Sequence, residues 1–329
     1  MWIKKIIAYG LLSFALINGF NHLTACTSNS NIDSQSISPN SKIYFKKYRS
    51  NLIRVEYLEP QNCNGEVVLF LPGWNYSAVD WKVKTTMVDS AIKGGFSVLL
   101  VDMGKSVYVD SIYPQARTDY KNYPTRTWLW NEVLSEYNHK GWFVDFSKSY
   151  SKPKSHVFGL STGARGAALL FLDHPTAFGK VVLLSGDFDP LLIKNDALLT
   201  HSMGKYDLFM WRWVQGSNNI QYRFNNAQIV PATHTNSFAD TAPTVELFVA
   251  HGHKDKVVPI IHSENLCAIL KQEEQDGTVY LKFTNEVDRK KNNRIHSIKI
   301  HVHCWLDPQG GHDYLFWEKA SLEAWNLMF

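Results

Sequence analysis

Residues 156–172 read HVFGLSTGARGAALLFL, and this stretch decides the fold that the sequence predicts. Its first part, His156–Leu160, is a short apolar run typical of a strand buried on both faces of a sheet. Small residues follow Ser161, so a helix can begin close against that strand. Gly159 and Gly163 flank the serine, and glycine relieves the crowding of a tight turn. The stretch therefore predicts a strand, a sharp turn carrying Ser161, and a helix.

Further strands and helices alternate on either side of this unit. Four more apolar runs are typical of buried strands: Glu66–Leu71, Phe96–Val101, Lys180–Leu184 and Val245–Ala250. Helix-like stretches occur at residues 77–93, 125–140, 162–174 and 260–272. Residues 42–60 alternate as two exposed edge strands would, and a strand over 297–305 and a helix over 313–329 close the chain. We expect the α/β class, with a mostly parallel central sheet flanked by helices.

Two segments are longer than this core requires. Residues 187–243 exceed a simple crossover and predict a cap or lid insertion. Its aromatic run YDLFMWRW, at 206–213, could roof an apolar acyl pocket or pack inside the cap, and the sequence leaves both open. Residues 273–295 predict an extra strand or hairpin, with the charged residues 288–291 at a solvated tip.

The N-terminal 25 residues have the organisation of an export signal. Lys4 and Lys5 precede the apolar stretch Ile6–Phe20, whose 15 residues fall short of the roughly 20 that span a bilayer. Residues 23–26 read LTAC, which resembles the lipobox of bacterial lipoproteins. That resemblance implies cleavage before Cys26, lipidation of its thiol and membrane anchoring in the cell envelope. An ordinary signal peptide and an uncleaved anchor are the alternatives.

The residues after Cys26 predict a tether and then one domain. Residues 26–41 are polar and cannot bury enough surface to fold, so we expect a flexible tether followed by a domain over 42–329. Thr27 is not the aspartate associated with inner-membrane retention in enteric bacteria, which favours the outer membrane. The net charge is +4, and removing Lys4 and Lys5 with the signal leaves +2. So small an excess gives no basic face, and nucleic acid is not an expected partner.

The cysteines predict at most one disulfide, and neither they nor the histidines predict a metal site. With Cys26 lipidated, Cys63, Cys267 and Cys304 remain, which allows at most one disulfide within the chain. Cys267 and Cys304 are the favoured pair because they fall on neighbouring late elements, while three buried thiols are the alternative. None of the cysteines or histidines has metal-ligand spacing, and we expect neither a metal nor a cofactor.

A serine needs a base to take its proton and a third group to orient that base. His312 is the candidate base, because the loop GGH at 310–312 follows the last strand and gives reach across the sheet. His296, His301 and His303 on or beside that strand are interpreted as structural. Asp255 is the candidate acid, since it follows the strand Val245–Ala250.

The competing acid position is the loop after the strand Lys180–Leu184, which contains Asp187 and Asp189. The chain order Ser161, Asp255, His312 is the order expected when the serine lies on a strand-to-helix turn of this kind. We therefore favour Asp255 as the acid.

The N-terminus of the predicted helix after Ser161 can also stabilise a negatively charged reaction intermediate. Its first N–H groups are unpaired and its dipole is positive there, so the backbone N–H of Thr162 is a natural oxyanion donor. The second donor should come from the loop PGWN at 72–75. Trp74 is the candidate, with Asn75 one residue away.

Four motifs together resemble a known family: LFLPGW at 69–74, GLSTGARGAALLFLDHPTAFGKVVLLSGDFDP at 159–190, HGHKDKVVP at 251–259 and GGHDYLFW at 310–317. The chain is similar over residues 66–320 to α/β-hydrolase-fold serine esterases of the esterase D kind. The resemblance implies metal-free hydrolysis of a carboxylic ester or thioester through an acyl-enzyme on Ser161. Two departures, LPGW where His-Gly is usual and Thr162-Gly163-Ala164 in place of Met-Gly-Gly, leave the subfamily open.

A serine esterase is therefore the first hypothesis for this sequence. A serine peptidase or lipase with the same three residues is the alternative among enzymes. A catalytically inactive surface binding protein that keeps the fold is the alternative outside them, because a fold does not guarantee an activity.

Overall fold

One mixed sheet organises the protein. The computed structural model describes residues 39–112, 120–144, 152–189, 216–226, 228–231, 244–271, 278–284 and 295–329. Ten strands pair in the order β1-β2-β4-β3-β5-β6-β8-β10-β9-β7. Their bounds are β1 Asn40–Tyr48, β2 Asn51–Glu59, β3 Val67–Leu71, β4 Ser97–Val101, β5 Ser155–Leu160, β6 Phe178–Leu184, β7 Gln228–Pro231, β8 Thr244–Gly252, β9 Thr278–Thr284 and β10 Ile295–Asp307.

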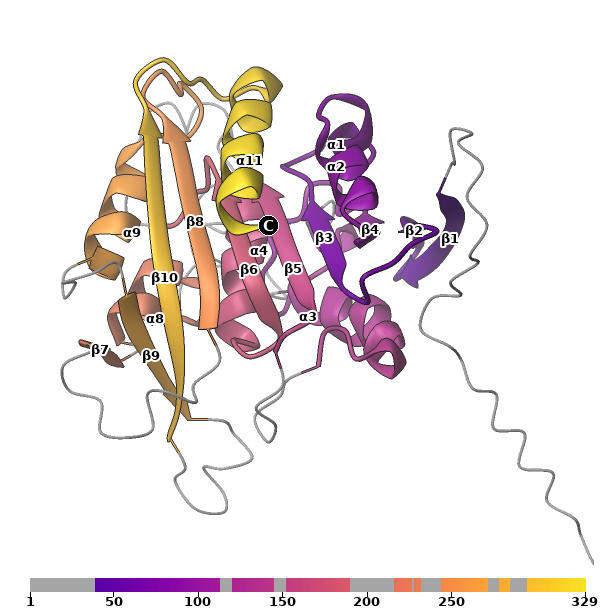
Figure 1. Cartoon of the computed structure of the whole chain (residues 1–329), viewed down its shortest axis with the longest axis horizontal. Helices are drawn as coiled ribbons and strands as arrows, with labels where there is room; N and C mark the ends of the chain where they lie inside the picture. Colours follow the sequence, from indigo (N-terminus) through magenta and orange to yellow (C-terminus); the bar gives the residue numbers. More distant parts are fainter. Residues whose placement is uncertain are drawn as a thin grey trace, which may run out of the picture.

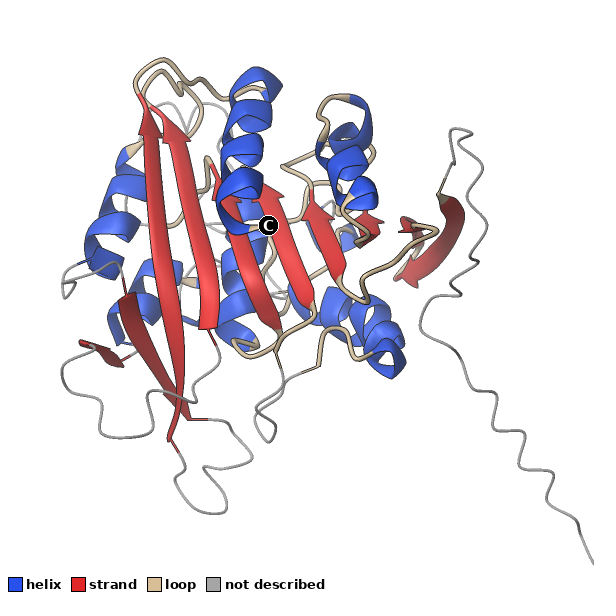
Figure 2. Cartoon of the chain, viewed as in Figure 1, coloured by secondary structure: helices blue, strands red, loops and turns tan. Residues whose placement is uncertain are grey.

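The centre of this sheet is parallel. β4, β3, β5, β6, β8 and β10 pair in parallel with one another, and their arrowheads share one edge (Figure 2). β3, β4 and β5 are buried at every position, which is why they read as continuous apolar runs. The predicted strands are confirmed with one correction: β1 is an edge strand, but β2 lies between β1 and β4 and is largely buried.

Helices cover both faces of the sheet. The bounds of α1, α2 and α11 on one face are Asp80–Val83, Met87–Lys93 and Tyr314–Met328. The bounds of α3, α4, α8 and α9 on the other are Arg126–Trp128, Thr162–Asp173, Ile220–Asn226 and Ile261–Lys271. Figure 1 shows the helices placed around the sheet. Each set packs on its own apolar cluster of strand residues. This is the predicted α/β-hydrolase architecture of a central sheet between helical layers.

Two helix predictions needed correction. Residues 77–93 form two short helices, α1 and α2, rather than one. Residues 125–140 are not a regular α-helix: α3 leads into a π-helical segment, Leu129–Val133, and a 3₁₀ segment, Leu134–Lys140. In both places most apolar residues are buried, although Val83 is exposed, so the apolar pattern located these helical segments but not their hydrogen-bonding type.

The long segment after β6 is described only in part. Its residues 216–231 contain a 3₁₀ turn at Gly216–Asn218, then α8 and β7, which adds an outer strand to β9. The aromatic run at 206–213 and the rest of the predicted cap lie outside the described residues, so a lid stays a prediction. β9 is the expected extra strand and pairs antiparallel with β10. In the part of the chain that the structure describes, no helix has the length and hydropathy of a membrane span.

Candidate active site

The turn after β5 places Ser161 above the sheet edge. Its backbone has φ 54° and ψ −125°, a conformation that costs energy for any residue with a side chain. Glycines on both sides make room for it. A Cβ on Gly159 would lie 2.2 Å from the carbonyl oxygen of Gly163, and one on Gly163 would lie 2.4 Å from that of Leu71. The predicted strand, turn and helix are therefore confirmed, together with the reason for both glycines.

Three side chains from distant parts of the chain meet at this turn. His312 Nε2 lies 3.0 Å from Ser161 Oγ, and His312 Nδ1 lies 2.6 Å from Asp255 Oδ2. His312 comes from the loop after β10, and Asp255 from the loop after β8. The carboxylate is fully buried and the imidazole nearly so. The structure thus joins the three predicted residues into one hydrogen-bonded chain.

Asp255 is held in place and kept ionised by its surroundings. Burial alone would raise the pKa of its carboxyl, but hydrogen bonds from His251 and His312 outweigh it and hold that pKa well below the usual range. Its other oxygen, Oδ1, accepts backbone N–H bonds from Val257 and Val258, both at 2.8 Å. An anion with these four partners can orient His312 and stabilise its protonated form.

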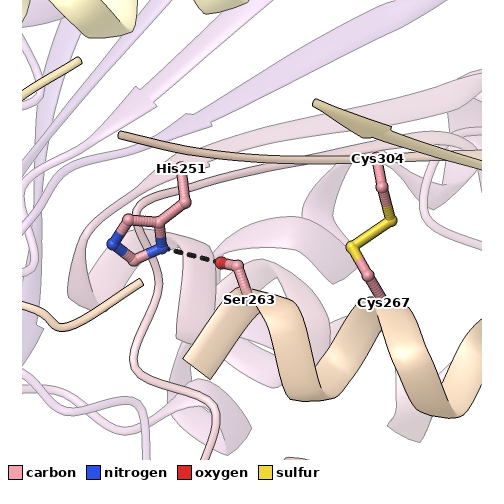
Figure 3. The surroundings of a disulfide bond; sticks show 4 residues. All are labelled: His251, Ser263, Cys267 and Cys304. Carbon is pink, nitrogen blue, oxygen red and sulfur yellow. Dashed lines mark hydrogen bonds between the residues drawn. A yellow bond between two sulfur atoms is a disulfide. The ribbon is translucent and has the colours of Figure 1, made fainter. Parts of the chain in front are cut away.

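His251 contacts Asp255, as His312 does, and was not identified as a site residue from the sequence. Its Nε2 lies 2.9 Å from the carbonyl oxygen of Val258 and 3.2 Å from Asp255 Oδ2, so this nitrogen carries the proton. Its Nδ1 then accepts from the hydroxyl of Ser263, at 2.7 Å (Figure 3). A histidine at the end of β8, just before the acid, was the available signal.

A disulfide lies on the same helix as Ser263. Cys267 of α9 is bonded to Cys304 of β10, with 6.3 Å between their Cα atoms (Figure 3). This is the pair that the sequence favoured if a disulfide formed, and the alternative of three buried thiols is wrong. Cys63 is disulfide-bonded as well, so the expectation of at most one disulfide within the chain is also wrong. The bond between Cys267 and Cys304 links α9, which carries Ser263, to β10, the strand that precedes His312. The elements that position His251 and His312 are therefore covalently joined.

Neither competing acid is the partner of His312 Nδ1. Asp187 Oδ2 is 3.7 Å from Arg165 Nη1, and Nδ1 of His312 is already bonded to Asp255. The backbone N–H of Asp189 donates to Nδ1 of His262, at 3.1 Å. The geometry therefore favours Asp255 over the loop after β6 as the partner of His312.

The loop after β3 runs alongside the serine. A Cβ on Gly73 would lie 3.1 Å from the Cβ of Ser161 and 2.9 Å from side-chain atoms of Leu160 and Tyr76, so the loop packs closely against the serine turn. The N–H of Asn75 donates to the carbonyl oxygen of Gly104 at 2.8 Å and is committed there. Thr162 is the first residue of α4, at its positive end. Trp74 and Thr162 stay the predicted oxyanion donors, and Asn75 is excluded.

Two of the histidines interpreted as structural have carboxylate partners away from the site. His301 Nδ1 and His303 Nε2 lie 2.8 and 2.9 Å from the carboxylate oxygens of Glu246 on β8. Among the described residues, no group of three or more histidine, cysteine or acidic side chains is arranged to hold a metal ion. Cys26 lies outside the described residues.

Solved structures share this fold at low sequence identity. The S-formylglutathione hydrolase of Agrobacterium tumefaciens is 14% identical with a TM-score of 0.57, covering 88% of this chain and 95% of its own. The fluorophosphonate-binding serine hydrolase F of Staphylococcus aureus is 15% identical with a TM-score of 0.56, covering 88% and 98%. MPT51 of Mycobacterium tuberculosis is 13% identical with a TM-score of 0.55, covering 88% and 98%. These likenesses show the fold.

Sequence comparison identifies the family. No protein with a curated description matches the chain. Residues 52–324, by contrast, match the model of a family described as Putative esterase, a range that includes Ser161, Asp255 and His312. The chain therefore belongs to this esterase family and is a hydrolase with the α/β-hydrolase fold.

Proposed function

We propose that the protein hydrolyses a carboxylic ester or thioester through an acyl-enzyme on Ser161. The observation that carries this proposal is the unbroken hydrogen-bonded chain from Asp255 through His312 to Ser161, at 2.6 and 3.0 Å. A base within hydrogen-bond reach of the hydroxyl, itself oriented by a buried carboxylate, is the arrangement that activates a serine.

In this mechanism Ser161 Oγ attacks the acyl carbonyl while Nε2 of His312 takes its proton. Asp255 stabilises the imidazolium that forms. The backbone N–H groups of Thr162 and Trp74 donate to the negatively charged oxygen of the tetrahedral intermediate. His312 then returns the proton to the departing alcohol or thiol, and the same base activates the water that releases the acid.

The first test uses a panel of p-nitrophenyl esters with acyl chains of two to eight carbons. We expect turnover of the short chains, and a loss of at least about a thousandfold in kcat for Ser161→Ala. Ser111→Ala, at an exposed serine, is the matched control and should match the wild type. Activity of Ser161→Ala within tenfold of the wild type would sink the nucleophile assignment.

The second test requires no substrate. A fluorophosphonate probe should label the wild type, and Ser161→Ala and His312→Ala should both lose the label. Absence of labelling of the folded wild type would favour an inactive binding protein. Adding a p-nitroanilide and a long-chain ester to the panel separates the three enzyme classes. An esterase should cleave the short-chain esters fastest, a peptidase the p-nitroanilide and a lipase the long-chain ester.

We also propose that the chain is exported and anchored through a lipid on Cys26, with residues 26–41 as the tether. The support is the sequence of residues 1–26 alone. Metabolic labelling with a radioactive fatty acid should mark the wild type, and Cys26→Ala should lose the label and leave the membrane fraction. A labelled Cys26→Ala protein would contradict the proposal.

A further inference from the structure

A buried carboxylate that the proposed mechanism does not use lies beside the active site. Asp187 follows the carboxyl end of β6, the strand between β5 and β8, which precede Ser161 and Asp255. It packs against Arg165, one helical turn beyond Ser161 on α4. Only 9% of Asp187 is exposed, and its charge interacts with that of His312. The carboxylate is therefore a neighbour of the reacting groups.

Arg165 does not satisfy this carboxylate. The guanidinium is fully buried and donates to three backbone carbonyl oxygens, those of Val107, Asp187 and Asn218. Its Nη1 stays 3.7 Å from Asp187 Oδ2, beyond hydrogen-bond distance. The other carboxylate oxygen, Oδ1, is buried and has no hydrogen-bond partner in the described structure.

The ion pairs of Asp173 show the geometry of a structural carboxylate–arginine contact in the same protein. Asp173, at the end of α4, accepts from Arg126 and from Arg223, each at 2.6 Å. Both of its oxygens are used. If Asp187 served only to neutralise Arg165, direct hydrogen bonds of this kind would be expected, because an unpaired buried acceptor destabilises the fold. The unpaired oxygen of Asp187 instead points to a ligand that supplies a donor.

The charge of Arg165 decides which donor fits. A substrate ammonium group beside Asp187 would also lie close to the buried guanidinium and be repelled by it. A neutral hydroxyl can donate to Oδ1 without that penalty. Sites built to pair with a substrate hydroxyl discriminate strongly against analogues that lack it, because their own polar group is then left unpaired.

We propose that Asp187 is a specificity-determining residue whose free carboxylate oxygen accepts a hydrogen bond from a neutral hydroxyl group of the substrate. This inference rests on the proposed function, and it names the substrate class as hydroxyl-bearing esters or thioesters. The hydroxyl can belong to the acyl chain or to the alcohol, and both give the same hydrogen bond to Asp187.

The test compares kcat/KM for two matched ester pairs. p-Nitrophenyl 3-hydroxybutyrate against p-nitrophenyl butyrate reports a hydroxyl on the acyl side. Glycerol monobutyrate against propyl butyrate reports hydroxyls on the alcohol side. In the wild type we expect at least a tenfold preference for the hydroxylated member of one pair, and the pair that shows it identifies which side of the ester meets Asp187.

Asp187→Leu removes the acceptor, and we expect the ratio of kcat/KM between the hydroxylated and the plain ester to fall to within twofold of unity, whatever the change in kcat/KM for the plain ester. Asp187→Asn keeps one amide oxygen and a similar shape, and it should show an intermediate preference. The matched control is Asp110→Asn, which removes a carboxylate that binds Ser217 and Asn218. It should keep the full preference.

Two results would overturn the inference while leaving the proposed function intact. One is a wild type that cleaves plain esters with no preference in either pair. The other is an unchanged preference in Asp187→Leu. Failure of the proposed function has a different signature, since then neither member of any pair is cleaved and the fluorophosphonate probe does not label Ser161.

Discussion

Replacing Asp187 by asparagine should change how the free energy of unfolding depends on pH. Burial raises the pKa of this carboxyl from 3.8 to about 6, although the charge of Arg165, the residue's own backbone N–H and the charge of His312 each lower it. The folded protein therefore holds the proton more tightly than the unfolded chain does. The stability that this proton contributes is complete below the unfolded pKa of 3.8 and is lost as pH rises through about 6.

The size of the effect follows from the two pKa values. Each unit of pKa difference corresponds to about 1.36 kcal/mol, so the shift from 3.8 to about 6 costs the ionised wild type about 3 kcal/mol at neutral pH. Asparagine does not titrate. The stability of Asp187→Asn relative to the wild type should therefore rise by about 2 kcal/mol between pH 4 and pH 7. Any change in packing adds a constant offset and leaves this slope unaffected.

Urea unfolding followed by tryptophan fluorescence at pH 4, 5, 6 and 7 measures the difference. Asp110→Asn is the control, because the pKa of Asp110 is lowered: burial would raise it, but hydrogen bonds from Ser217 and Asn218 outweigh that. The stability that ionised Asp110 contributes is lost only as pH falls below the unfolded pKa of 3.8. The difference in unfolding free energy between Asp110→Asn and the wild type should therefore be level from pH 5 to pH 7. A level or falling curve for Asp187→Asn over the same range would refute the reasoning.

Three further predictions concern the frame of the site. Because Cys267 and Cys304 are separated by 37 residues, replacing both by alanine should lower the free energy of unfolding by about 4 kcal/mol, and a loss below 1 kcal/mol in urea titrations would contradict this. Gly163→Ala should lower fluorophosphonate labelling at least a hundredfold, since its Cβ would lie 2.4 Å from a backbone oxygen of β3. His251→Ala should lower kcat about 10- to 100-fold with KM unchanged, and His251→Gln, which keeps an N–H donor, should recover part; equal kcat values would exclude a positioning role.

The candidate site could be predicted from sequence to the extent that local patterns specify it. Residues 156–172 determine a buried strand, a tight turn and a helix through apolar runs and glycines, all of which act over a few residues. The order of strands and helices then makes Asp255 and His312 the natural partners, because carboxyl ends of parallel strands share one edge of the sheet. Hydrophobic burial and chain connectivity carry that information.

Only the tertiary structure decided which buried polar groups pair with which. The sequence left Asp187 and Asp255 as rival acids, and the positions of His251 and Arg165 separate their roles by giving one a full set of hydrogen bonds and the other a loose ion pair. It also left the thiols open until α9 and β10 were seen side by side. Hydrogen bonds and ion pairs depend on distances of a few tenths of an ångström between residues far apart in the chain, and residue patterns carry no such distances.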